Sequence, residues 1–111
     1  MRRVNEAVRQ VLSEALPELK DPRIGFVTVT RVETARDLGT AKVWVSVLGT
    51  PEEQESAIKA MTDAAPWLRR QLGDRLTLRK IPQLVIRHDD SIESGDRVLR
   101  ILKELEEGQG S

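Results

Sequence analysis

The segment from residue 21 to residue 48 constrains the fold most, because its pattern is typical of a β-hairpin. Pro22 fixes its own φ and biases Asp21 away from helix, which predicts a turn before the first strand. The residues that follow are β-branched or aromatic, and they alternate with a period of two. One set is Phe26, Thr28, Thr30 and Val32, and the other set is Val27 and Val29.

A second alternating stretch follows a polar connection. Residues 34–40 contain Asp37 and Gly39, which favour a reversal of the chain. Residues 41–48 then resume the alternation, so that valines occupy one face. The valines are Val43, Val45 and Val47, and the opposite face carries Lys42, Trp44 and Ser46. A hairpin of this kind fits a small α+β domain.

Before the hairpin, apolar residues recur at intervals of three and four, which predicts a first helix. The apolar stripe consists of Val4, Val8, Val11, Leu12, Ala15 and Leu19. Three arginines lie off this stripe, namely Arg2, Arg3 and Arg9. They face either solvent or the phosphates of a partner, and the pattern leaves both interpretations open.

A second helix follows the hairpin. Thr50 is suited to cap it, Pro51 suits its first position, and Glu53 completes a capping box. Apolar residues keep the helical period as far as Leu72, and we expect Gly73 to end the helix.

Pro66 interrupts this helical pattern. It lacks the N–H that would bond the carbonyl of Thr62, and its ring clashes with that carbonyl. We therefore expect the helix to kink or break at Ala65-Pro66, so that one period yields two helices. Trp67, one residue further on, either packs against the core or stacks on a nucleic-acid base.

The C-terminal part of the chain predicts one more strand and one more helix. The strand, at residues 84–86, is entered through Pro82, and the helix starts at Asp90 or Ser91. Together with the hairpin, this strand gives a three-stranded sheet.

Charge is unevenly distributed in a chain whose formal net charge is zero. Residues 69–87 contain six bases and one acid, a charge of +5, whereas residues 88–107 contain seven acids and three bases, a charge of −4. Five of the bases precede the third strand, namely Arg69, Arg70, Arg75, Arg79 and Lys80. They either bind the phosphate backbone of an RNA or pair with the acids of the C-terminal helix.

Composition excludes several classes of protein. The absence of cysteine rules out a disulfide scaffold or a zinc knuckle and fits a reducing cytosol. No apolar run approaches the roughly 20 residues that span a bilayer. His88, Asp89 and Asp90 lack the spaced second ligand of a zinc site, so we predict no metal, no cofactor and no catalytic residue. We expect one domain over residues 1–105 and a disordered tail over residues 106–111.

Six short motifs cover the chain from the first helix to about Leu102. They are DPRIG, VTVTRVE, RDL, AKVWVSVLG, LRRQLGDRLTLRKIPQL and HDDSIESGDRVLRIL. In this order and spacing they resemble the ribosome-binding factor A family, whose bacterial members help to mature the small ribosomal subunit. The resemblance implies a KH-like (type II) α+β fold with a three-stranded sheet packed against helices. The implied order is helix, strand, strand, helix, kink, helix, strand, helix.

The same resemblance implies a function. It suggests a non-enzymatic, cytoplasmic factor that binds 16S rRNA in the immature small subunit and assists late processing and assembly, also in adaptation to cold. No feature demands more than a monomer. On this interpretation the basic residues named above contact the RNA backbone. The alternative is a protein–protein interaction module of KH-like or ferredoxin-like build that does not bind RNA directly.

The chain departs from the family at the expected bend. Ala64-Ala65-Pro66 stands where the family usually has Ala-x-Gly, at the place of the GxxG loop of ordinary KH domains. A proline bends the chain but offers no amide to a phosphate. The resemblance therefore carries the structural role of the bend to Ala64, Ala65 and Pro66, but not a sequence-specific grip on RNA.

Overall fold

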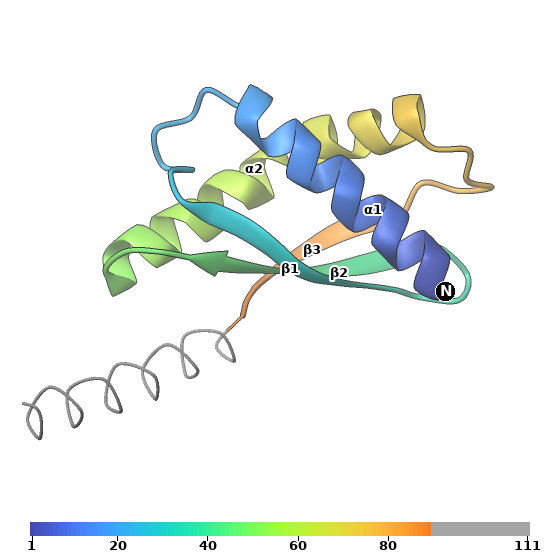
Figure 1. Ribbon diagram of the computed structural model, residues 1–111, viewed down its shortest axis with the longest axis horizontal. Helices are drawn as coiled ribbons and strands as arrows, with labels where there is room; N and C mark the ends of the chain where they lie inside the picture. Colours follow the sequence, from blue (N-terminus) through green and yellow to red (C-terminus); the bar gives the residue numbers. More distant parts are fainter. Residues whose placement is uncertain (90–111) are drawn as a thin grey trace, which may run out of the picture.

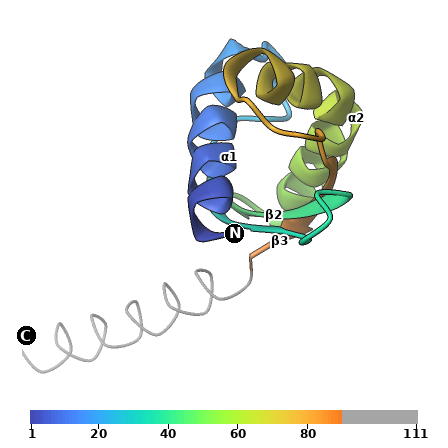
Figure 2. The same ribbon diagram turned by 90° about the vertical axis from the view of Figure 1, so that its right-hand side faces the viewer.

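The computed structural model describes residues 1–89, which form a two-layer α+β fold (Figure 1). Two helices lie on one face of a three-stranded sheet (Figure 2). In chain order the elements are α1 (Arg2–Ala15), the short 3-10 helix η1 (Leu16–Glu18), β1 (Val27–Thr34), β2 (Thr40–Val47), α2 (Pro51–Arg75) and β3 (Gln83–His88). The predicted fold class, a sheet packed against helices, is confirmed. Within residues 1–89, no helix has the length and apolar character needed to cross a bilayer.

Three predictions fall on residues beyond this range. The last helix expected from Asp90 or Ser91, the end of the domain at residue 105 and the tail at 106–111 all lie outside the described residues.

The sheet has the strand order β1-β2-β3. β1 and β2 pair antiparallel, as the predicted hairpin requires, and β2 and β3 pair parallel. A parallel pair of strands needs a crossover connection, and α2, which lies between β2 and β3 in the chain, provides it. β2 directs its valines toward the helices and its other side chains toward the opposite face, as predicted: Val43, Val45 and Val47 are buried, and Lys42, Trp44 and Ser46 are not.

A β-bulge at Thr30 interrupts the alternation predicted for β1. Val29 pairs with Val45 and Arg31 pairs with Trp44, so that Thr30 is an extra residue in the register. An insertion of this kind moves every later side chain of the strand to the opposite face.

The bulge therefore places Val32 on the buried face together with Val27 and Val29. The sequence pattern grouped Val32 with Phe26 and Thr28, and that part of the prediction is wrong. All the residues around the insertion are acceptable in a strand, so a period of two does not reveal where one residue is added.

The core lies between the sheet and the two helices. α1 buries the stripe that the sequence predicts, and α2 buries a second one. The buried helical residues are Val8, Val11, Leu12 and Ala15 of α1, and Ala57, Ala60, Met61, Leu68 and Leu72 of α2. Burying one such leucine, valine or methionine side chain stabilises the fold by about 1.5–3 kcal/mol.

The N-terminus of α2 has the predicted capping box. The Thr50 hydroxyl accepts a hydrogen bond of 3.2 Å from the Glu53 N–H, and the Glu53 carboxylate accepts one of 3.2 Å from the Thr50 N–H. These two bonds satisfy backbone donors that a helix start leaves unpaired.

α2 runs through Pro66 to Arg75 as one helix, so the predicted division into two helices is wrong. Ala64, Ala65 and Pro66 all lie within it. Pro66 removes one backbone hydrogen bond, but Pro66 and Thr62 are exposed, so that water can satisfy the Thr62 carbonyl. The axis of α2 nevertheless changes direction in its second half in both views (Figures 1 and 2).

Gly73 does not end α2, contrary to the prediction. The helix continues to Arg75, and Leu76 is the first residue with extended backbone. A glycine ends a helix by adopting a positive φ, and Gly73 keeps a helical conformation.

Candidate nucleic-acid interface

Exposed cations gather at the end of the molecule where α2 leads into β3. Arg70 lies near the end of α2, and Arg79 and Lys80 lie in the connection. All three are exposed, and none forms a salt bridge within residues 1–89. We call Arg70, Arg79 and Lys80 the basic connection.

A shallow cavity of about 630 Å³ lies beside the basic connection. It opens between the second half of α2 and the residues before β3, and Pro66 forms part of its wall. Its lining residues are Pro66, Arg69, Arg70, Gly73, Asp74 and Ile81. Pro66 and two of the cations that the sequence singled out, Arg69 and Arg70, therefore line the same hollow, together with the acid Asp74.

Arg69 has a structural role at this end. Its Nε donates a hydrogen bond of 3.0 Å to the carbonyl oxygen of Pro82, and one Nη donates one of 2.9 Å to the carbonyl oxygen of Ile81. The side chain is half-buried, so it holds the connection against α2. It was predicted to bind RNA, but its guanidinium is already engaged with backbone.

Arg75 is also engaged within the protein. One Nη lies 2.7 Å from the Glu18 carboxylate, and the other lies 3.9 Å from the Glu14 carboxylate. Arg75 thus ties the end of α2 to the end of α1 and to η1. The sequence allowed such arginines to pair with C-terminal acids, but within the described residues the acids of Arg75 come from α1 and η1.

The N-terminal arginines separate into two kinds. Arg2 and Arg3 are exposed and form no salt bridge with any described residue. Arg9 lies 2.9 Å from Glu6, and this hydrogen bond lowers the pKa of the Glu6 carboxyl below its ordinary value. Arg9 is therefore neutralised by its neighbour one turn away.

Two contacts bring the start of α1 to the same end as the basic connection. The Asn5 side chain accepts a hydrogen bond of 2.9 Å from the Thr34 N–H, and the Gln83 N–H donates one of 3.0 Å to the Gly39 carbonyl. Figure 1 shows the N-terminus, the turn between β1 and β2, and the connection between α2 and β3 on one side of the molecule.

The turn between β1 and β2 adds a cation that the sequence reasoning missed. Arg36 is exposed and forms no salt bridge within the part of the chain that the structure describes. It belongs to the RDL motif, which served only as evidence for the family. The signal that could have found it is its position in a chain reversal, because such turns present side chains to solvent.

Trp67 packs against the hydrophobic core and is half-buried. Of the two interpretations that the sequence allowed, the structure therefore favours packing over stacking on a base.

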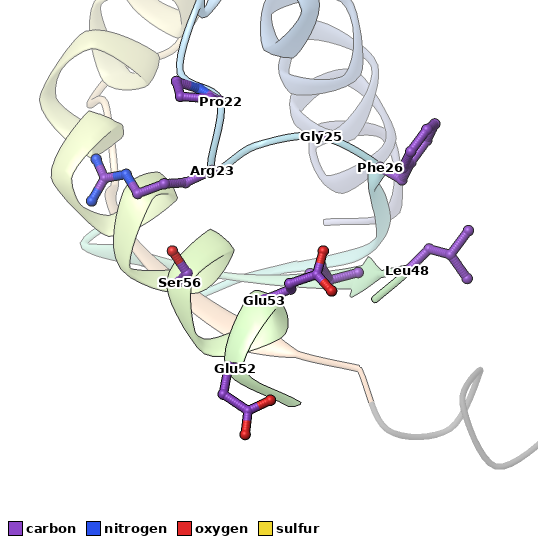
Figure 3. Close-up of a pocket in the computed structure, with 9 residues that line it drawn as sticks. Pro22, Arg23, Gly25, Phe26, Leu48, Glu52, Glu53 and Ser56 are labelled. Atoms are coloured by element: carbon purple, nitrogen blue, oxygen red, sulfur yellow. The ribbon is translucent and has the colours of Figure 1, made fainter. Parts of the chain in front are cut away.

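A second cavity, of about 580 Å³, lies at the opposite end of α2 (Figure 3). Phe26 and Leu48 border it and are 76% and 72% exposed, and a backbone hydrogen bond of 3.1 Å joins the two residues. Glu52 and Glu53, in the first turn of α2, line the same cavity. Arg23 also lines this cavity, but it is paired with Asp21 and Asp63. The two glutamate carboxylates, which form no salt bridge within residues 1–89, therefore repel a phosphate, and this hollow does not fit the RNA backbone.

Asp89, which directly follows β3, has a structural role. The Asp89 carboxylate accepts a hydrogen bond of 2.6 Å from the Thr30 hydroxyl and so connects β3 to the bulge of β1. Within residues 1–89 no group of three or more histidine, cysteine, aspartate or glutamate side chains is placed to hold a metal ion.

Fold and charge together define a class: a small α+β domain that presents exposed cations at one end. The model of the ribosome-binding factor A family matches residues 1–102. The chain belongs to this family.

Relatives and solved structures agree with this assignment. The chain is 46% identical over 102 residues to ribosome-binding factor A of Desulfitobacterium hafniense, which covers 91% of this chain and 82% of the relative. It is 40% identical over 108 residues to that of Natranaerobius thermophilus, with 96% and 82% covered. The crystal structure of ribosome-binding factor A from Thermus thermophilus superposes with a TM-score of 0.72 at 25% identity, covering 78% of this chain and 93% of that one.

A second similar structure comes from a complex. It is a homology model of the Thermus thermophilus protein fitted into a cryo-electron microscopy map of a 30S–RbfA complex. The TM-score is 0.66 at 26% identity, with 78% of this chain and 91% of that chain covered.

Proposed function

We propose that this protein is a ribosome maturation factor that binds 16S rRNA in the immature small ribosomal subunit and assists late processing and assembly. It acts as a monomer in the cytoplasm, without catalysis or cofactor, through a KH-like domain. Family membership supports this proposal, and so does the similarity to a protein fitted into a map of a 30S complex.

The observation that carries the proposal is the basic connection. Arg70, Arg79 and Lys80 are exposed beside a hollow and have no carboxylate partner among residues 1–89. An unpaired surface cation gains more from a phosphate than one that must first leave an ion pair. Arg2, Arg3 and Arg36 extend the same end of the molecule and add further phosphate contacts.

The proposed binding relies on shape and charge. Pro66 contributes no N–H, so the bend cannot clamp a nucleotide as the GxxG loop does. Phosphate contacts fix position and carry no sequence information by themselves. Arg69 and Arg75 act indirectly: they hold the connection and the end of α2 in place while their neighbours meet the RNA.

A second candidate function is binding to another protein. The exposed Phe26 and Leu48 form an apolar corner beside the carboxylates of Glu52 and Glu53. Such a corner suits a basic protein segment with an apolar side chain better than it suits RNA. This surface lies away from the basic connection, so the two functions are separable by mutation.

Co-sedimentation with immature small subunits tests the main proposal. The variant is Arg79→Glu with Lys80→Glu, and its matched control is Lys20→Glu with Lys59→Glu, which reverses two exposed lysines elsewhere. We expect the first variant to bind much more weakly than the parent and the control to bind as the parent does. Between about 50 and 200 mM salt, the slope of log affinity against log salt should change by about 2 on losing two phosphate contacts. Equal binding by both variants would refute the proposed interface.

A further inference from the structure

Three side chains form a row across the face of the sheet that α1 and α2 leave uncovered. The register places Arg31 of β1 opposite Trp44 of β2, and Trp44 opposite Arg87 of β3. Side chains at opposed positions in neighbouring strands point to the same face. Both helices lie on the other side of the sheet (Figure 2).

The centre of the row is a stacked pair. The guanidinium carbon of Arg31 lies 3.9 Å from the centroid of the Trp44 ring, which is a close cation–π contact. Trp44 remains partly exposed, and Arg31 and Arg87 are exposed. Neither arginine forms a salt bridge with any residue in the range 1–89. The row therefore presents an aromatic ring between two guanidinium groups that no carboxylate of residues 1–89 pairs with.

The charge around the row favours an anion. Lys42 adds a third cation next to Trp44 on β2, and Glu33 lies opposite Lys42. The other acid on this side, Asp89, accepts a hydrogen bond from the Thr30 hydroxyl and is half-buried. Cations thus outnumber acids at the row itself, where the two arginines border the indole.

The chemistry of the row also excludes a mainly apolar partner. The exposed large hydrophobic residues of the described chain are Met1, Phe26 and Leu48, and none lies in the row. Its neighbours on the same face include Thr28 and Ser46, which are polar, and Val85, which is apolar and half-buried opposite Lys42. The two arginines beside the indole disfavour a mainly apolar surface, because such a surface would bury their charges without a counter-charge.

A nucleotide whose base is unpaired has one group for each part of the row: a base that can stack on Trp44 and Arg31, and a phosphate that can bind Arg87. Bases stack on aromatic rings and on guanidinium planes, and each such stack contributes about 1–3 kcal/mol. A guanidinium beside the stack meets the phosphate with paired hydrogen bonds. We propose that the row of Arg31, Trp44 and Arg87 binds one unpaired ribonucleotide of the RNA, with its base on the Trp44–Arg31 stack and its phosphate at Arg87.

This inference rests on the proposed RNA-binding function and adds a second contact to it. The basic connection binds phosphates at one end of the molecule, whereas the row binds a single-stranded segment on the face of the sheet that α1 and α2 leave uncovered. The two surfaces use different residues, so their failures are distinguishable.

Tryptophan fluorescence tests the row directly. The chain has two tryptophans, so Trp67→Phe leaves Trp44 as the sole indole. We expect hexaadenylate and hexauridylate to quench Trp44 emission in this full-length variant, with saturation. Adding Arg87→Gln should weaken the binding about tenfold, the effect of losing one base or phosphate contact. Lys59→Gln, an exposed cation on α2, is the matched control and should leave it unchanged.

A second arm separates this inference from the proposed function. Arg79→Glu with Lys80→Glu should bind subunits much more weakly but still show hexanucleotide quenching. If neither hexanucleotide quenches Trp44 while the parent chain still binds subunits, the row does not bind RNA and only the proposed function stands. If Arg31→Gln or Arg87→Gln weakens subunit binding without any quenching by RNA, the face contacts a ribosomal protein, which also overturns the inference.

Discussion

Arg69 donates a hydrogen bond of 3.0 Å from its Nε to the carbonyl oxygen of Pro82, thirteen residues further along the chain. This contact and its companion to Ile81 hold the connection between α2 and β3 against the helix. Pro82 is buried, so its carbonyl has little access to water and depends on the arginine. The position of Arg79 and Lys80 therefore depends on Arg69, whose guanidinium is bonded to the backbone of the same connection.

Arg69→Ala should destabilise the fold by about 1.5–3 kcal/mol, because two charge-assisted hydrogen bonds to backbone are lost. Arg70→Ala is the matched control: it removes the same side chain from the next position, where it is exposed, and should change stability by less than about 0.5 kcal/mol. Urea denaturation measures both. Subunit binding should respond to Arg70→Ala even though its stability is unchanged. Equal stability of the two variants would show that the Arg69 contacts are dispensable.

Asn5 should contribute more to the stability of the fold than the exposed polar residues of α1 do. Its side chain accepts the Thr34 N–H at 2.9 Å, and Thr34 is buried. Asn5→Ala leaves that backbone donor unpaired, which costs about 1–3 kcal/mol. Gln10→Ala, on the exposed side of the same helix, provides the control and should stay within about 0.5 kcal/mol of the parent. If Asn5→Ala unfolds at the same urea concentration as the parent, water takes the place of the Asn5 side chain as the acceptor of the Thr34 N–H.

Pro66→Ala should raise the thermal stability. Alanine restores the N–H that can bond the Thr62 carbonyl, and proline in a helix interior is less favourable than alanine by about 3 kcal/mol. The gain should be smaller than this value, because the bend of α2 already accommodates the ring (Figure 1). Calorimetry of the two proteins decides. A lower melting temperature would indicate that core packing requires the bend itself.

Local patterns were sufficient to predict most of the fold. The capping box of Thr50 and Glu53 lies within four residues, and the valines of β2 repeat at intervals of two. Both signals depend on near neighbours, and both are confirmed. The continuity of α2 through Pro66 is different, because it depends on the packing on both sides of the proline and on the exposure of Thr62 and Pro66 to water. The sequence shows that Pro66 removes one backbone hydrogen bond, but it does not show the packing and the exposure to water that offset this loss.

The site was less predictable than the fold. The sequence identified the basic residues but could not tell Arg69 and Arg75 from Arg70 and Arg79. The distinction depends on partners far along the chain, such as Glu18, which lies 57 residues from Arg75. The row at Trp44 was equally hidden, because the register that joins Arg31 to it includes a bulge. The position of a bulge decides which residues of two strands lie opposite each other, and an alternating sequence pattern does not show where the bulge is.

Acid should weaken the turn that precedes β1. The Arg23 side chain donates hydrogen bonds to the Asp21 carboxylate, with one Nη at 2.7 Å, and these lower the pKa of Asp21 from its ordinary value of 3.8. A carboxyl whose pKa is depressed in the folded state stabilises that state at any pH above its unfolded pKa. This contribution is complete at neutral pH, and it is lost as the pH falls from about 4 through the folded pKa.

Asp21→Asn removes this contribution. The variant should be less stable than the parent at pH 7, and the difference should shrink as the pH falls below about 4, where the parent loses the same interaction. Asp74→Asn is the control, because Asp74 is exposed and forms no salt bridge within residues 1–89. Urea midpoints at three pH values around 4 give the comparison. A difference between Asp21→Asn and the parent that stays constant across this range would place its cause outside the Arg23 interaction.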